Sequence, residues 1–525
     1  MSAEPVVAVR AGLIRTLDPE HPQVECLAAR GDRVEAVGSK EEIDSLVGGS
    51  AVWLDLRPAV IVPGLTDSHV HLIEWATGRS GPDLAGAESM AEALERIELV
   101  AGGAPADTWL EFKGWNPVWR RQAELADLDA ASKGRAVALI AHDLHQGWLN
   151  SEALRRLEIV PERADPPGGL VRRDQDGSPD GVLMESALDW WYQGRPRASE
   201  SDQGTAFLEG QAALHRWGIT SVHSVEAPES FRILEDLERA GELRLRILHH
   251  MPQRFIDSLI ECGIVSGFGN DWLRVGGIKY FTDGALGSCT AWMLEPYIDS
   301  DDCGIRRLEP EEFSHDVQRA ARAGLAATVH AIGDAAVRMT LDTLEAAGAR
   351  GLAMPHRIEH LQCVHPDDLS RAGRLGVVAS MQPSHLLTDI PLAGPRWGPE
   401  RSRWTLPLRS LLGAGTILAF GSDAPVEEPD PREGFYSAIA RQDRGGHPSD
   451  GWYPEERIGG LDVLKAYTEG PAYAAGDLNR RGRLSPGYYC DFAAWDVDPV
   501  TAEPERMLSA QVAATVVGGE LVFSA

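Results

Sequence analysis

Eight short apolar segments alternate, along the middle of this chain, with stretches whose apolar spacing is helical, and this alternation constrains the fold most strongly. Alternating strands and helices are typical of a parallel sheet, and eight such units predict a closed, TIM-like (β/α)8 barrel of the α/β class. Helical stretches such as Glu311–Ala323 and Ala335–Ala346 separate the later strands. The expected strands are Gly64–His71, Thr220–Val225, Arg244–His249, Leu273–Phe281, Ala326–Ile332, His356–Leu361, Val377–Gln382 and Ile417–Ser422. Functional residues of such a barrel lie at the carboxyl ends of its strands.

The two ends of the chain differ from its middle, because both have the pattern of short strands joined by tight turns. Over residues 1–62 the expected strands are Val6–Val9, Glu25–Arg30, Arg33–Val37 and Val52–Asp55. Over residues 480–525 they are Phe492–Asp496, Gln511–Val517 and Leu521–Phe523, with a hairpin turn at Gly518-Gly519. We therefore expect a small β-sandwich domain that is built from both termini and flanks a barrel over residues 63–479.

An insertion is expected over the barrel mouth, at about residues 80–210, because the first two barrel strands are too far apart for an ordinary connection. This stretch contains Trp109, Trp115, Trp119, Trp148, Trp190 and Trp191. Two interpretations stay open for these rings. They form the core of the insertion itself, as buried aromatic rings commonly do, or one or two of them line an apolar substrate pocket.

The net charge of the chain limits the partners that it can bind, and its cysteines indicate the cellular compartment. The formal net charge of −29 disfavours binding to nucleic acid and to anionic membranes. Six cysteines occur without a CxxC pair, which fits reduced thiols in the cytoplasm. Met1–Arg15 lacks the apolar core of a secretion signal, and no apolar run reaches about 18 residues. We expect a cytoplasmic protein with a small-molecule substrate; a homodimer would be unsurprising, although no motif indicates one.

Five residues that can bind a metal ion occupy matching places at the ends of the expected strands. His69 and His71 alternate along the first strand, so their side chains share a face. His330 ends the fifth strand, His360 ends the sixth, and Asp423 follows the eighth. A single such placement arises readily by chance, whereas five together indicate a centre for a divalent metal, for which zinc suits the donors best.

Lys279 lies inside the apolar fourth strand, where an unpaired ammonium group is costly to bury. One solution is an ion pair with a carboxylate. The other is a lowered pKa, which would let the neutral amine add carbon dioxide and form a carbamate that bridges two metal ions. The residues alone leave both open.

The sequence words around these residues resemble the amidohydrolase superfamily, in which HxH, Lys, His, His and Asp follow strands one, four, five, six and eight. The words PGLTDSHVH, KYFTDGALGSCTA, VHAIGDAAV, RIEHLQCVHP, MQPSH and FGSDAPVEEPDP look like its family 3 branch, which includes N-substituted formamide deformylases. The resemblance covers nearly the whole chain. It is specific for the fold and the metal centre, and much less so for the substrate.

The resemblance implies a role for each matching residue. His69, His71 and Asp423 would bind the more buried metal ion, and His330 and His360 would bind a second one. A carboxylated Lys279 would bridge both ions. The word HDLHQGWLNS is similar to a family segment whose histidine reaches the site, so His145 would contact the substrate or polarise its carbonyl group.

Less specific words mark further pocket residues. The stretch from Gly168 to Glu185 looks like a family hairpin, although a structural turn explains it at least as well. Asp283, Gln382 and His385 are expected to bind substrate.

The implied reaction is hydrolysis of a C–N bond in an amide, N-formyl compound or related substrate, with Asp423 as the general base. The apolar, Trp-rich insertion favours a small, partly hydrophobic or aromatic amide. Three alternatives stay open: a deaminase of the same superfamily with one metal ion, a metallohydrolase for esters or phosphoesters, and a non-catalytic metal-binding regulator.

Overall fold

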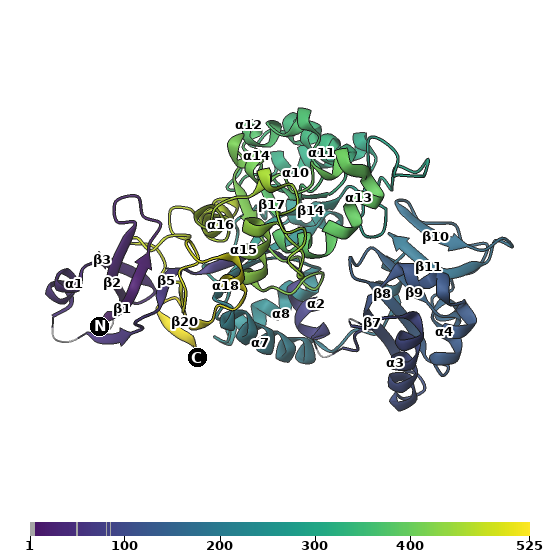
Figure 1. Cartoon of the computed structure of the whole chain (residues 1–525), viewed down its shortest axis with the longest axis horizontal. Coiled ribbons are helices and arrows are strands. Elements are labelled where there is room, and N and C mark those ends of the chain that lie inside the picture. The colour runs from purple at the N-terminus through teal and green to yellow at the C-terminus, as the bar shows by residue number, and fades with distance from the viewer. Residues whose placement is uncertain (1–5, 49–50, 80, 85) are drawn as a thin grey trace.

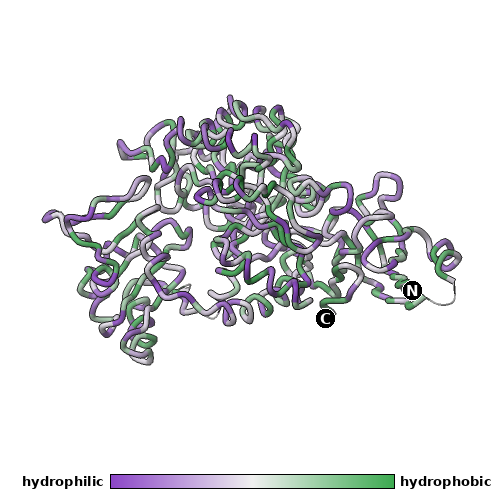
Figure 2. The backbone as a smooth tube through the Cα atoms, turned by 180° about the vertical axis from the view of Figure 1, so that it is seen from behind, coloured by the Kyte–Doolittle hydropathy of each residue, from purple (hydrophilic) through white to green (hydrophobic). Residues whose placement is uncertain are grey.

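The computed structural model describes residues 6–48, 51–79, 81–84 and 86–525. Figure 1 shows a small β-domain with both chain termini at one end, a barrel in the centre and the insertion at the opposite end. Hydrophobic segments gather in the central strands, and hydrophilic segments are frequent on the outer loops (Figure 2). Within the described residues, no helix is both long and apolar enough to cross a membrane.

The central body is a TIM-like barrel, as predicted. Its parallel strands pair in the order β18-β17-β16-β15-β14-β13-β12-β6. The strands are β6 (Leu65–Val70), β12 (Ile219–Val225), β13 (Arg246–Pro252), β14 (Leu273–Phe281), β15 (Ala327–Ala331), β16 (Arg357–His360), β17 (Val378–Met381) and β18 (Leu418–Phe420). The barrel closes because the chain after β18 returns to β6: the Asp423 N–H donates to the His69 carbonyl and the His71 N–H to the Ala424 carbonyl, each at 2.8 Å.

Local sequence explains why these elements form. Strand β14 is buried along almost its whole length, as expected for a parallel strand that is covered on both faces. Its Gly277 has no room for a side chain, because an added Cβ would lie 2.6 Å from the carbonyl oxygen of Ala326, the residue before β15. Helix α10 (Pro310–Arg322) buries Phe313, Val317 and Ala320, which share one helical face.

Other helices surround the barrel. They are α2 (Leu72–Gly78), α7 (Glu200–Arg216), α8 (Pro228–Arg239), α9 (Ile256–Glu261), α11 (Asp334–Ala347), α12 (Arg371–Leu375), α13 (Leu386–Ser402), α14 (Leu408–Gly413), α15 (Pro431–Ala440), α16 (Gly460–Ala466) and α17 (Glu469–Ala474).

The small β-domain is one curled sheet with strands from both ends of the chain. Strands β1 (Val6–Arg15), β2 (Gln23–Arg30), β3 (Arg33–Gly38), β4 (Val52–Asp55) and β5 (Val60–Pro63) come from the first part, and β19 (Phe492–Trp495), β20 (Val512–Val517) and β21 (Glu520–Ser524) from the last. Both halves face one shared apolar core. Strand β5 and helix α1 (Lys40–Val47) were not predicted, although the capping box of Ser39 and Glu42 marks the start of that helix.

The insertion carries a five-stranded sheet in the order β10-β11-β9-β8-β7. Its strands are β7 (Trp109–Trp115), β8 (Ala136–Ala141), β9 (Gln146–Leu149), β10 (Gly169–Arg173) and β11 (Pro179–Glu185). The helices α3 (Met90–Gly103) and α4 (Leu125–Ala131) pack on one face over a core that includes Trp115 and Trp148. Trp191 is buried on the other face. Trp115 also lines an apolar cavity beside the barrel mouth, and whether that cavity takes substrate stays a prediction.

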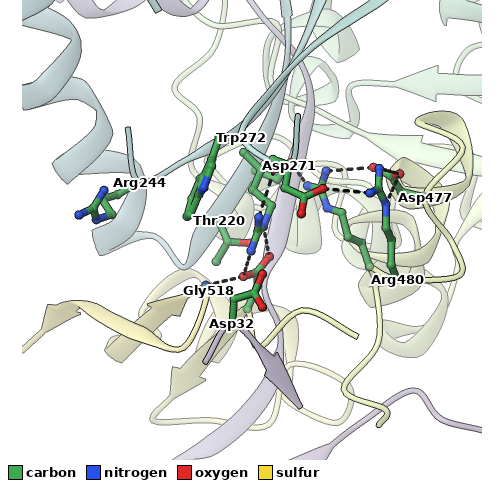
Figure 3. A network of polar contacts seen from close by, with 12 residues as sticks. Asp32, Thr220, Arg244, Asp271, Trp272, Asp477, Arg480 and Gly518 are labelled. Carbon is green, nitrogen blue, oxygen red and sulfur yellow. Dashed lines mark hydrogen bonds and ion pairs between the residues drawn. The ribbon is translucent and has the colours of Figure 1, made fainter. Parts of the chain in front are cut away.

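A buried ionic network joins the amino ends of the barrel strands to the small β-domain (Figure 3). Arg246, the first residue of β13, donates to Asp491 at 2.7 Å. The Gly518 N–H, in the hairpin between β20 and β21, donates to the same carboxylate at 2.7 Å. The network lies at the amino ends of the barrel strands, whereas functional residues of such a barrel lie at the carboxyl ends. We therefore infer that the network stabilises the fold.

Replacing Asp477 by asparagine is expected to lower the free energy of unfolding by roughly 3–5 kcal/mol, because it removes a buried charge from its partners. The Asp477 side chain is 2% exposed, and it pairs with Arg274, with Arg480 at 2.6 Å and with Arg481 at 3.4 Å. Urea denaturation measures the effect, with the exposed Asp301→Asn as control. Equal midpoints for the two variants would show that the network does not stabilise the fold.

Candidate active site

Six predicted ligands lie around one cavity at the carboxyl ends of the barrel strands. The cavity has a volume of about 450 Å³. Its lining includes His69, His71, Lys279, His330, His360 and Asp423. Residues that are up to several hundred positions apart in the sequence therefore share one site, as the sequence predicts.

Asp423 is the centre of this group. Its Oδ1 lies 3.3 Å from His69 Nε2 and 3.4 Å from His71 Nε2, and its Oδ2 lies 4.0 Å from His360 Nε2. One ligand atom from each of His69, His360 and Asp423 falls within 4.8 Å of the others, which is a spacing that one metal ion can span. The ring of His330 lies next, 4.6 Å from that of His360 between centroids.

The backbone is strained where these ligands leave their strands. Asp423 has φ of 62° and His360 has φ of 68°, and residues other than glycine rarely adopt this left-handed region. Such conformations persist only where the surrounding structure enforces them, and they concentrate at functional sites. His360 is the last residue of β16 and Asp423 lies three residues after the end of β18, and both side chains line the cavity.

Hydrogen bonds orient two of the imidazole rings. His69 Nδ1 donates to Glu359 Oε2 at 2.5 Å, which leaves Nε2 free to face the cavity. Arg357 donates to both oxygens of Glu359 and holds that carboxylate in place. His330 Nε2 donates to the Gly284 carbonyl at 3.1 Å, which leaves Nδ1 free. Contacts of this kind fix the tautomer of a metal-binding histidine.

Glu359→Gln is expected to weaken metal binding roughly 10–100-fold, because the amide cannot match the charged acceptor behind His69. Competition with a chromophoric chelator measures the affinity, and circular dichroism checks that the variant is folded. Glu400→Gln, on the exposed end of α13, is the matched control. An unchanged dissociation constant would remove Glu359 from the support of the site.

Lys279 forms no ion pair with any residue that the structure describes, although an ion pair was one of the two ways in which its burial could be explained. Its Nζ is buried and has no hydrogen-bond partner among the described residues. Burial lowers the pKa of Lys279 to about 8, against the opposing influence of Glu359 and Asp423. A neutral amine is therefore accessible near neutral pH, which is the form that reacts with carbon dioxide.

The donor set fits a divalent metal ion. Burial holds the pKa of His69, His330 and His360 below its usual range, so these rings are neutral, which is the form that binds metal. Burial opposes charge on Asp423, but the neighbouring imidazoles outweigh it and hold the pKa of Asp423 well below its usual range. His360 Nδ1 is buried without a partner in the described part of the chain.

His145 reaches the site from the loop between β8 and β9 of the insertion. Its ring lies 5.3 Å from that of His330. Its Nδ1 lies 2.9 Å from Glu185 Oε2, and Arg307 donates to the same oxygen at 3.1 Å. Burial opposes protonation of His145, but Glu185 outweighs this and raises the pKa of the ring. The sequence analysis gave no role to Glu185 or Arg307. Glu185 is the last residue of the stretch that looks like a family hairpin.

The three expected pocket residues occupy different surroundings. Asp283 accepts from the backbone N–H groups of Trp292, Ile332 and Gly333. Gln382 is buried and donates to the Ser380 carbonyl at 3.3 Å. His385 lines a cavity, with Nε2 3.9 Å from Asp423 Oδ2. Of the three, only His385 lines either of the two cavities at the site among the described residues.

A second cavity, of about 400 Å³, meets the first at the metal-ligand cluster. The two cavities share Asp143, His145, His360, Asp423 and Val426. The first is the more polar of the two, and its lining includes the charged side chains of Arg197, Arg254, Arg307, Glu74 and Asp189. The second is mainly apolar, and its lining includes Trp115, Pro117, Val118, Leu286, Ile332 and Leu392.

The fold and the site together define a metal-dependent hydrolase: a closed (β/α)8 barrel with histidines and an aspartate at the carboxyl ends of its strands. A model of the Amidohydrolase family matches residues 53–523. The chain belongs to that family, and the resemblance read from its sequence words is confirmed.

Individual relatives agree with this assignment. The chain is 32% identical to Protein LONG AFTER FAR-RED 3 of Arabidopsis thaliana, over 98% of this chain and 91% of the relative. It is 26% identical to N-substituted formamide deformylase of Arthrobacter pascens, over 97% of each. Among solved structures, an uncharacterized metal-dependent hydrolase of Pyrococcus horikoshii OT3 superposes with a TM-score of 0.77 at 26% identity, over 95% of this chain and 99% of that one.

Proposed function

We propose that this protein hydrolyses the C–N bond of a small amide or N-formyl amine, at a centre of one or two divalent metal ions that is best suited to zinc. The observation that carries the proposal is the convergence of four histidines, Asp423 and an unpaired lysine on one cavity, under a fifth histidine. The similarity to a formamide deformylase supports a C–N substrate. We also expect a cytoplasmic location, for which the reduced cysteines are the support.

The proposed ligands are His69, His71, His330, His360 and Asp423, and Lys279 would be a further one if it is carboxylated. When bound, divalent ions at these ligands would lower the pKa of water and polarise a carbonyl group. In this proposal Asp423 would take the proton of the attacking water and return it to the leaving nitrogen.

His145 is the proposed electrophilic partner of the substrate. Glu185 holds its Nδ1, so Nε2 faces the space above the ligands and can donate to the carbonyl oxygen as negative charge develops there. Arg307 fixes Glu185 in turn. The apolar second cavity is the proposed binding site for one substituent of the amide.

The decisive experiment combines elemental analysis with a panel of N-formyl and N-acyl amines, and it assays release of the amine. We expect one or two equivalents of metal and turnover of at least one amide. Release of ammonia from an amidine-like ring would identify a deaminase. Release of alcohol or phosphate from ester substrates would identify the other hydrolase class. A metal-loaded, folded protein that is inactive on every class would indicate a regulator.

A further inference from the structure

Two carboxylates in the lining of the apolar second cavity, Asp143 and Asp389, form no ion pair with a described residue. Both oxygens of Asp143 accept hydrogen bonds, from the His145 N–H and the Ser288 hydroxyl, whereas Asp389 is only half satisfied. Asp389, in the first turn of α13, lines this cavity and is 9% exposed. Its Oδ2 accepts from Gln362 Nε2 at 2.6 Å. Its Oδ1 accepts no hydrogen bond from the described residues and is not enclosed by protein, so it faces the cavity. A half-satisfied carboxylate among apolar side chains is costly unless a ligand completes it.

Of the cationic groups near Asp389, three have other partners, whereas His385 Nε2 lies 3.9 Å from Asp423 Oδ2 and has no hydrogen-bond partner among the described residues. His142 Nε2 lies 3.1 Å from Glu427 Oε1, and Arg444 donates to Glu427 Oε2 at 3.0 Å. Arg396 lines the same cavity but donates to the backbone carbonyl of Leu286. Within the described residues no lysine, arginine or histidine forms an ion pair with Asp389, so the carboxylate is available to a ligand.

Burial disfavours the negative charge of Asp389 but does not remove it at neutral pH. Burial raises the pKa of Asp389 to about 6, while His385 and His142 oppose the shift and Glu427 adds to it. At neutral pH the group is therefore mainly ionised. A cationic ligand would relieve the cost of this buried charge, whereas a second carboxylate would increase it.

We propose that the apolar cavity binds a substituent of the substrate that carries a positively charged nitrogen, and that Asp389 selects for this charge. The ligand class is an arylalkyl or alkyl ammonium group of a size that fits about 400 Å³. Its apolar part would pack against Trp115, Leu286 and Leu392, and its N–H would donate to Asp389 Oδ1. This inference rests on the proposed function only for the identity of the scissile bond.

Binding is tested first, without catalysis. Calorimetry on the metal-free protein compares 4-methylbenzylammonium with 4-methylbenzyl alcohol, which has the same shape and no charge. We expect the ammonium ion to bind about 10–100-fold more tightly, which is the value of one charge-assisted hydrogen bond. Asp389→Asn should remove the difference, Asp389→Glu should retain part of it, and the exposed Asp301→Asn should leave it unchanged.

Turnover is tested second, with N-formyl benzylamines that carry a para aminomethyl, methyl or carboxylate group. The same three groups are then placed on the acyl side, as para-substituted phenylacetamides. We expect the aminomethyl compound to have the highest kcat/KM in one of the two series, and Asp389→Asn to abolish that preference while the methyl compound is still hydrolysed.

The two failures are distinguishable. Equal binding of the ammonium ion and the alcohol, or a preference that survives in Asp389→Asn, would overturn the role of Asp389 even if amides are hydrolysed. Retained ammonium binding without turnover of any amide would overturn the proposed function and leave the cation site standing. Thermal melting of each variant excludes loss of fold as the cause.

Discussion

Replacing Asp423 by asparagine is expected to lower kcat by roughly 10²–10⁴-fold, which is the usual contribution of a general acid–base group. The amide keeps an oxygen that can still ligate a metal ion, but it cannot take a proton from water or return one to the leaving nitrogen. Because Asp423 Oδ1 also lies beside His69 and His71, some loss of metal affinity is expected as well. Saturating metal separates the two effects.

The measurement is steady-state turnover together with metal content by elemental analysis. Asp301→Asn, on an exposed turn, is the control for the chemical change alone. Near wild-type turnover by Asp423→Asn, with its metal retained, would show that another group handles the proton. His145 would then be the next candidate, because its ring faces the same cavity.

Metal removal is expected to abolish activity, and recovery is expected to need both metal and bicarbonate. Stripping at low pH releases the ligands and decarboxylates a carbamate. Lys279 would then have to regain carbon dioxide before two ions could be held, and its pKa of about 8 allows this at neutral pH. Activity is therefore followed after dialysis with zinc alone and with zinc plus bicarbonate.

A ¹³C-labelled bicarbonate supplies an independent measurement, because a carbamate carbon has its own resonance. The control is Lys279→Met, which is similar in size and cannot add carbon dioxide. We expect it to bind at most one ion and to show no labelled signal. Full recovery of the wild type with zinc alone, in buffer free of carbon dioxide, would favour an unmodified Lys279.

Much of the barrel could be predicted from the sequence because buried parallel strands leave a strong pattern. Strand β14 was predicted with its observed bounds, since its apolar run ends sharply on both sides. Strand β5 was missed because four apolar residues before a glycine resemble the start of the next strand. The alternation of strands also placed His69, His330, His360 and Asp423 at one end of the barrel, where the structure brings them together.

The sequence could not predict the contacts that depend on how the insertion sits over the barrel. Glu185 and Arg307 are 122 positions apart, and nothing in the local pattern of either residue indicates that both hold His145. Asp389 lies in α13, where no sequence motif marks it as a ligand-binding residue. Only its placement against Gln362 and the apolar wall of the second cavity reveals a charge without a cationic partner.

The closure of the barrel between β6 and the chain after β18 has a consequence for how the protein is synthesised. Asp67 on β6 accepts from the hydroxyl of Ser422 at 2.5 Å, across 355 positions of sequence. Two proposed ligands lie close by in the sequence, His69 two residues after Asp67 and Asp423 next to Ser422. During synthesis, the ribosome must therefore release nearly the entire barrel before the last ligand can reach the first. Metal binding would then be possible only late in synthesis. Chains that are truncated before Ser422 would lack the residues through which a metal ion joins the two ends of the barrel.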